Sequence, residues 1–148
     1  MKFSWPTEQE KDVINSIRDV IGRETLWYVV TSVSGCSACN LDPINNSSTD
    51  AFCPVCSGLY WIPTYSGISI NSHITWGYSE KQDWETGGQL DIGECSVQVE
   101  YTQANLDAVD NAKWAVIDGK KMKIINKVLR GVKDINRIIV YFTEKDKE

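Results

Sequence analysis

The chain has 148 residues, of which 42% are hydrophobic, and a formal net charge of −5. This length and apolar content predict one folded domain, residues 1–148, and exclude a disordered chain. No stretch reaches the roughly 18 to 20 uninterrupted apolar residues that cross a bilayer, and the first ten residues lack the apolar run of a secretory signal. We therefore expect no membrane partner and folding in a cytoplasm.

The N-terminal third predicts one helix followed by one strand and a loop. Apolar residues recur at helical spacing before Gly22, at Val13, Ile14, Ile17, Val20 and Ile21. Residues 25–33 are rich in β-branched and aromatic side chains, which indicates a buried strand. Residues 40–52 are crowded with Asn, Asp, Ser and Pro and show no apolar period, so they predict a loop.

The middle of the chain predicts three strands. Residues 58–65 indicate a short strand that Pro63 interrupts, and residues 68–76 keep apolar side chains on one parity. Residues 77–88 indicate a polar connection. The clearest alternation comes next, where Cys95, Val97, Val99 and Tyr101 alternate with polar residues, and it predicts a half-buried strand.

The C-terminal third predicts a helical turn, a hairpin and a last strand. The helical turn is expected over residues 105–111, and the last strand over 135–143. Between them, Asp118-Gly119 separates two apolar runs and predicts a tight hairpin turn, because both residue types accept positive φ. The predicted fold is therefore mainly β, a small β-barrel or rolled antiparallel sheet with one N-terminal helix and an inserted four-cysteine zinc loop.

Two Cys-x-x-Cys pairs carry the strongest chemical signal in the sequence. Cys36 and Cys39 form the first pair, and Cys53 and Cys56 form the second. Two intervening residues let both sulfurs of a tight turn reach one ion, and zinc prefers four such thiolates in a tetrahedron. The sequence thus predicts a zinc knuckle inserted over residues 34–58, in which Gly58 leads the backbone away with positive φ.

The same cysteines allow other interpretations. Paired disulfides, unrelated free thiols and iron–sulfur ligation remain alternatives, although an odd total of five cysteines suits thiolate ligands in a reducing compartment. Four protein ligands would fill the coordination shell of zinc, which predicts a structural cofactor and no catalytic metal.

The remaining candidate residues favour structural roles. We expect Cys95 to be a buried free thiol and no fifth ligand or nucleophile, and His73 to be a surface or hydrogen-bonded residue. The tryptophans in strand-like segments favour core packing over base stacking: Trp27, Trp61, Trp76 and Trp114. No nucleophile–base pair or phosphate loop is recognisable, so we expect no enzyme and no catalytic residues.

Charge is unevenly distributed along the chain. Residues 113–137 contain eight basic and two acidic residues, against seven basic and eighteen acidic residues elsewhere. A solvated hairpin is one interpretation of the basic segment. Contact with an acidic protein neighbour or with phosphates is the other, since lysines attract either without reading sequence.

The segment WAVIDGKKMKIINKVLRGVKDINRIIVYFTEK resembles the C-terminal half of small head-closure, or stopper, proteins in the neck of tailed bacteriophages. The resemblance covers about residues 95–145 and does not include the cysteine insertion. It implies a ring-forming homo-oligomer in the virion, assembled in the host cytoplasm. It also implies portal, adaptor or tail proteins as neighbours. The basic segment additionally predicts non-specific proximity to DNA.

The leading hypothesis is a structural virion protein, a head–tail connector subunit that joins portal and tail and carries a structural zinc site. The alternative is a zinc-ribbon module that binds nucleic acid or protein, which the all-cysteine ligand set and the basic segment favour. Against the alternative stands the acidic total, with a pI near 4.9.

Overall fold

The structure is a computed structural model that describes residues 7–77, 95–131 and 134–144. Its contacts divide the chain into two compact units: unit 1 comprises residues 1–28 and 67–148, and unit 2 comprises residues 29–66. The predicted zinc-knuckle insertion, residues 34–58, falls within unit 2. The predicted polar connection, residues 77–88, lies outside the described residues except for Gly77.

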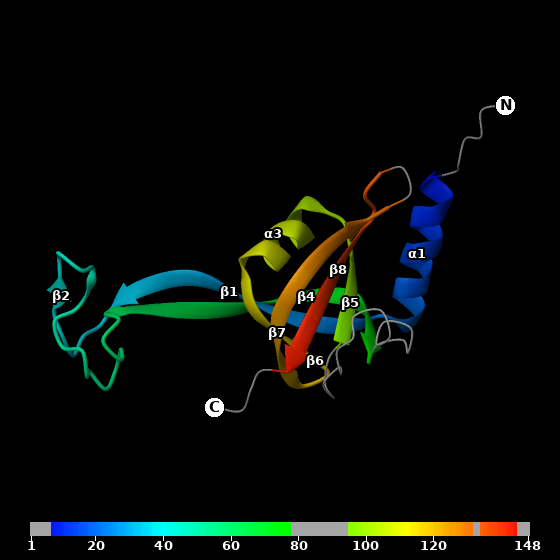
Figure 1. The fold of residues 1–148 in the computed structure, drawn as a ribbon. Helices are drawn as coiled ribbons and strands as arrows, with labels where there is room; N and C mark the ends of the chain where they lie inside the picture. Colours follow the sequence, from blue (N-terminus) through cyan, green and yellow to red (C-terminus); the bar gives the residue numbers. More distant parts are fainter. Residues whose placement is uncertain (1–6, 78–94, 132–133, 145–148) are drawn as a thin grey trace, which may run out of the picture. The chain divides into compact units, whose positions relative to one another are not determined.

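Six antiparallel strands form a closed barrel in the order β1-β4-β5-β8-β7-β6. Figure 1 labels these strands. Their bounds are β1 Arg23–Gly35, β4 Trp61–Trp76, β5 Cys95–Glu100, β6 Ala112–Ile117, β7 Lys120–Arg130 and β8 Arg137–Glu144. The β1 and β4 strands continue beyond unit 1 into unit 2. The closed barrel and the N-terminal helix confirm the predicted fold class, and closure leaves no unpaired edge strand in the barrel.

The predicted hairpin joins β6 to β7. Asp118 has φ 50° and Gly119 has φ 78°, the positive pair that a two-residue hairpin turn requires. Ala115 pairs with Met122 across the hairpin, and both side chains are completely buried. The turn therefore sets the register that sends these side chains inward.

The barrel interior is filled by apolar side chains that alternate along each strand. The completely buried ones are Trp27, Cys95, Val97, Val99, Ala115, Ile117, Met122, Ile138, Val140 and Phe142. A second helix, α3 (Gln103–Asn111), adds Ala108 and Val109 to this core, and Thr102 caps its N-terminus by accepting from the Asn105 amide at 3.2 Å.

A polar chain crosses the core without leaving its donors unpaired. The Trp27 Nε1–H donates to Thr25 Oγ1 at 2.9 Å, and Thr25 shares a 2.8 Å hydrogen bond with Ser72. The Ile70 carbonyl accepts from Thr25 at 3.1 Å. Because these hydroxyls are completely buried, the bonds remove the desolvation cost that unpaired groups would carry.

Pro63 does not interrupt the strand, contrary to prediction. A single strand, β4, runs from Trp61 to Trp76 and includes Pro63. Within unit 2 this part of β4 lies beside β1, where the Thr31 hydroxyl donates to the Thr64 carbonyl at 3.1 Å. A two-stranded ribbon has one outer edge per strand, and a residue that faces that edge needs no amide donor.

The N-terminal helix α1, Thr7–Ile21, forms where predicted, but it packs with an unexpected face. Its apolar residues Val13 and Val20 are 58% and 82% exposed, whereas Arg18 is only 4% exposed. Arg18 Nη1 donates to Asn15 Oδ1 at 2.7 Å, and the helix also pairs with the barrel through Glu10 and Arg137 at 3.2 Å. The Glu10–Arg137 pair therefore joins the polar face of the helix to the barrel, and most of the apolar stripe is left exposed.

Candidate metal centre

Unit 2 brings the four predicted zinc ligands together. The Sγ atoms of Cys36, Cys39, Cys53 and Cys56 all lie within 4.8 Å of one another. Cys36 and Cys53 are 3.8 Å apart, and Cys39 and Cys56 are 3.5 Å apart. Since a disulfide bond is about 2.05 Å long, these pairs are free thiols and not disulfides.

The sulfur spacing fits a tetrahedral metal. With a Zn–S bond of about 2.3 Å, the edge of a regular ZnS₄ tetrahedron is about 3.8 Å, close to both measured sulfur pairs. The sulfurs lie in a shielded site, because Cys36, Cys53 and Cys56 are buried and Tyr60 and Ile62 pack against them. The cluster can therefore hold one metal ion with all four ligands from the chain, and four soft thiolates suit zinc.

Backbone hydrogen bonds fix both cysteine pairs. In the first pair, the Ala38 amide donates to Cys36 Sγ at 3.4 Å, and the Cys36 amide donates to the Tyr60 carbonyl at 2.8 Å. In the second pair, the Ser57 amide donates to the Cys53 carbonyl at 2.8 Å. Such bonds orient the thiols before any ion binds. Ion binding therefore costs less conformational entropy.

The segment between the pairs contains structure that the sequence did not predict. Two short strands, β2 (Leu41–Asp42) and β3 (Ser47–Ser48), pair antiparallel in the region expected to be a plain loop. Asp42 accepts from the Ile44 amide at 2.9 Å, and Asn46 takes φ 52° at the turn. The Asn and Asp residues that indicated a loop instead form this small hairpin.

The net pKa shifts of two cysteines have opposite directions, because their neighbouring thiols act oppositely while burial raises both pKa values. For Cys39, the Ser48 hydrogen bond lowers the pKa, but burial and the other three thiols raise it to about 12. For Cys56, burial raises the pKa, but the Tyr60 and Gly58 backbone and neighbouring thiols lower it to about 6. Ion binding releases the thiol protons, because only thiolates serve as ligands.

Gly58 is required at the exit of the second pair, as the sequence predicts. It has φ +84°, and an added Cβ would lie 2.8 Å from the Ala51 carbonyl oxygen. We expect Gly58→Ala to weaken zinc binding at least tenfold, because the left-handed backbone alone costs alanine about 1–2 kcal/mol and the clash adds to it. Competition with a chromogenic chelator measures this affinity.

Gly119→Ala is the matched control for Gly58→Ala. Gly119 has φ +78°, but nothing lies within 4 Å of an added Cβ. This variant should lose about 1 kcal/mol of stability and keep wild-type zinc affinity. Equal zinc affinities for the two variants would contradict the role assigned to Gly58.

Cys95 lies apart from the cluster, and the prediction of a buried free thiol is confirmed. Its side chain is completely buried on β5 within the barrel. Burial, aided by the charge of Asp118, raises the pKa of this thiol to about 12. Cys95 is therefore held protonated and inert in the folded protein.

Stability should fall at alkaline pH because of Cys95. The unfolded thiol loses its proton near pH 9 and the folded one near 12, so this contribution is complete below 9 and is lost as pH rises. Between pH 8 and 10, wild type should lose about 1 kcal/mol relative to Cys95→Ala. Urea titrations of both proteins test this, and an unchanged difference would contradict it.

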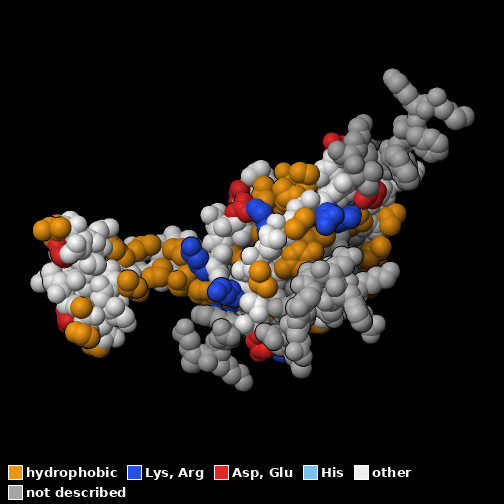
Figure 2. Space-filling model, viewed as in Figure 1, with side chains coloured by type: hydrophobic (Ala, Val, Ile, Leu, Met, Phe, Trp, Pro, Cys, Tyr) orange, Lys and Arg blue, Asp and Glu red, His pale blue; other side chains and the backbone are white. Residues whose placement is uncertain are grey.

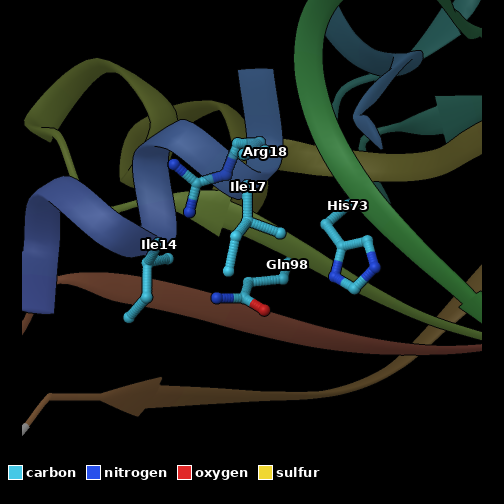
Figure 3. Close-up of a pocket in the computed structure, with 5 residues that line it drawn as sticks. All are labelled: Ile14, Ile17, Arg18, His73 and Gln98. Atoms are coloured by element: carbon cyan, nitrogen blue, oxygen red, sulfur yellow. The ribbon is translucent and has the colours of Figure 1, made fainter. Parts of the chain in front are cut away.

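A pocket of about 160 Å³ opens beneath α1, and Figure 3 shows its lining. The lining residues are Ile14, Ile17, Arg18, His73 and Gln98. His73, which was expected at the surface or in a hydrogen bond, is half-buried here and lines the pocket. Burial lowers the Arg18 pKa, an effect that the Glu100 carboxylate opposes. The Nε and Nη2 atoms of Arg18 are buried without a hydrogen-bond partner among the described residues.

Sequence reasoning missed Arg18. The only signal was its position four residues after Ile14, next to the apolar stripe of the helix.

The tryptophans were predicted more successfully: Trp27 is completely buried and Trp76 packs against the core. Trp61 is instead exposed on unit 2, and Trp114 stacks on Tyr28 with centroids 5.3 Å apart.

No protein-family model, curated protein or solved structure matches this chain. In the part of the chain that the structure describes, no helix is both long enough and apolar enough to cross a membrane.

Proposed function

We propose that the four cysteines bind one structural zinc ion. The tetrahedral sulfur spacing supports zinc, and a shell filled by four protein ligands leaves no position for a substrate. Unit 2 has a small apolar cluster of its own, made by three of the cysteines with Cys39, Tyr60 and Ile62 beside them. A bound ion would therefore supply much of the free energy that folds this unit.

We propose further that the protein is a structural virion component, a ring-forming head–tail connector subunit of a tailed bacteriophage. The observation that carries this proposal is the exposure of large apolar side chains outside a barrel whose interior is already filled. On α1 these include Val20, 82% exposed, and on unit 2 Phe52, 93% exposed. Exposed apolar clusters on folded proteins commonly mark surfaces that other chains cover. The closed barrel with its Asp-Gly hairpin also suits the resemblance to neck proteins.

Native mass spectrometry tests both proposals together. Protein prepared under reducing conditions should carry one zinc per chain and form a closed oligomer as its concentration rises. A persistent monomer that never enters particles would overturn the connector role, whereas absence of metal would overturn the zinc site. Chelator treatment then reports whether the oligomer depends on the metal.

A nucleic-acid-binding module is the second candidate, because one observation favours it. Trp114 stacks on Tyr28 and lies 4.2 Å from the Lys121 ammonium, so aromatic rings and basic groups share one surface. Stacking combined with positive charge is the chemistry that binds single strands. Retention of the monomer on single-stranded DNA that fades with salt would favour this function.

A further inference from the structure

The metal-binding unit exposes four large apolar side chains, which we call the tip surface: Ile44, Phe52, Val55 and Leu59. Ile44 and Phe52 are 90% and 93% exposed. Three of the four come from residues 52–59, which contain the second cysteine pair. A bound metal would hold them in place, so a partner could cover them at little cost in conformational entropy.

The tip surface carries negative charge only. Unit 2 is described throughout, and it contains no Lys, Arg, His or Glu, so its charged side chains are Asp42 and Asp50. Each lies two residues before an exposed apolar residue and accepts from its amide, Asp42 from Ile44 at 2.9 Å and Asp50 from Phe52 at 3.0 Å. Four thiolates around one divalent ion add a further net charge of about −2. Figure 2 shows hydrophobic and acidic side chains on this unit.

Unit 1 offers exposed basic and apolar side chains on the outer face of β7, which we call the basic strip: Lys121, Lys123, Ile125 and Arg130. All four side chains are exposed. The ion pairs among the described residues use other basic groups, namely Arg23, Lys127 and Arg137. Lys123 and Arg130 therefore lack an acidic partner within the described part of the chain.

The register of β7 and β8 places two positive charges opposite each other, which destabilises the sheet. Arg130 lies directly opposite Arg137 in the β7–β8 ladder. Like charges at paired positions of a sheet are destabilising. Arg137 is compensated by Glu10, but Arg130 is exposed and has no acidic partner among the residues that the structure describes, so an acidic group from another chain would relieve the repulsion.

We propose that the tip surface of one copy binds the basic strip of a second copy. Ile44 and Phe52 would cover Ile125, while Asp42 and Asp50 approach the basic side chains of the strip. Such a contact joins two different surfaces, so repeated copies close into a ring or extend as a filament. This inference rests on the proposed connector function and names the contact that would build the ring.

The mixed chemistry of the basic strip favours a protein over a nucleic acid. Phosphates would neutralise Lys123 and Arg130 but would leave Ile125 uncovered. An acidic tip with large apolar side chains matches both properties. The chain itself supplies that tip in a one-to-one ratio.

Photo-cross-linking tests the contact directly. Phe52, which is almost fully exposed, is replaced by p-benzoylphenylalanine in the full zinc-loaded chain, and unlabelled and ¹⁵N-labelled chains are mixed before irradiation. We expect cross-links between light and heavy chains, from position 52 to residues 120–131. Cross-links elsewhere, or only within one chain, would overturn the inference.

Charge reversal supplies an independent test. Lys123→Glu and Phe52→Asp should each raise the dissociation constant of the oligomer at least tenfold and keep one zinc per chain. Lys11→Glu, the same charge change at an exposed position on α1, should leave assembly unchanged. Oligomers that ignore Lys123→Glu would overturn this contact alone. A strict monomer, or a strip that binds DNA without assembly, would overturn the connector function as well.

Discussion

Replacing Cys53 by serine is expected to abolish zinc binding and to unfold unit 2. The Cys53 side chain is 2% exposed, and its sulfur lies 3.8 Å from that of Cys36. Serine cannot supply a soft thiolate, so the tetrahedral shell would stay incomplete. Structural zinc provides about 10–16 kcal/mol of apparent binding free energy in small zinc domains, which is more than typical domain stability.

Hydrogen exchange distinguishes this local unfolding from a global one. In Cys53→Ser, the amides of Cys36 and Ser57 should lose protection from hydrogen exchange. Their hydrogen bonds to the Tyr60 and Cys53 carbonyls lie within unit 2. The β5–β8 ladder of the barrel should keep its protection. Cys95→Ala is the matched control, since it also removes one buried thiol but should retain one zinc. Protected unit 2 amides in metal-free Cys53→Ser would contradict the proposed zinc site.

Short-range sequence patterns predicted the elements whose structure is determined by residues close together in the sequence. The alternation around Val97 and Val99 indicated a strand with one buried face, and both side chains are completely buried. Asp118-Gly119 indicated the hairpin because few residue pairs accept two positive φ angles. The spacing of the cysteine pairs indicated convergent thiols, and the four sulfurs do converge.

Features that depend on distant partners could not be predicted in this way. The period of α1 indicated an amphipathic helix, but its packing face depends on pairing with distant residues, such as Glu10 with Arg137. Pro63 suggested a break in the strand. Whether a strand can include a proline depends on which of its edges is unpaired, and the local sequence does not show this for β4. The β2–β3 hairpin was missed because two-residue strands have no measurable period.

Phe142→Ala should cause a large loss of stability in the barrel, about 3–5 kcal/mol. The ring is completely buried on β8 and packs against Trp27, with centroids 5.3 Å apart and planes tilted by 58°. Truncation removes this contact and leaves a cavity that the closed barrel has little freedom to fill. Urea denaturation measures the loss, and the melting temperature should fall by roughly 10 °C.

Two further variants separate cavity formation from a general effect on β8. Phe142→Leu keeps most of the apolar volume and should lose less than half as much stability as Phe142→Ala. Thr143→Ala changes the adjacent half-buried residue, which points out of the barrel, and should stay within about 0.5 kcal/mol of wild type. Because Phe142 and Thr143 lie in unit 1 and the four cysteines lie in unit 2, zinc stoichiometry should be unchanged in all three folded variants. If Phe142→Ala were as stable as Thr143→Ala, the barrel interior could not be packed as described. If it also lost its zinc while still folded, the two units would be thermodynamically coupled, and the local unfolding expected for Cys53→Ser would fail with it.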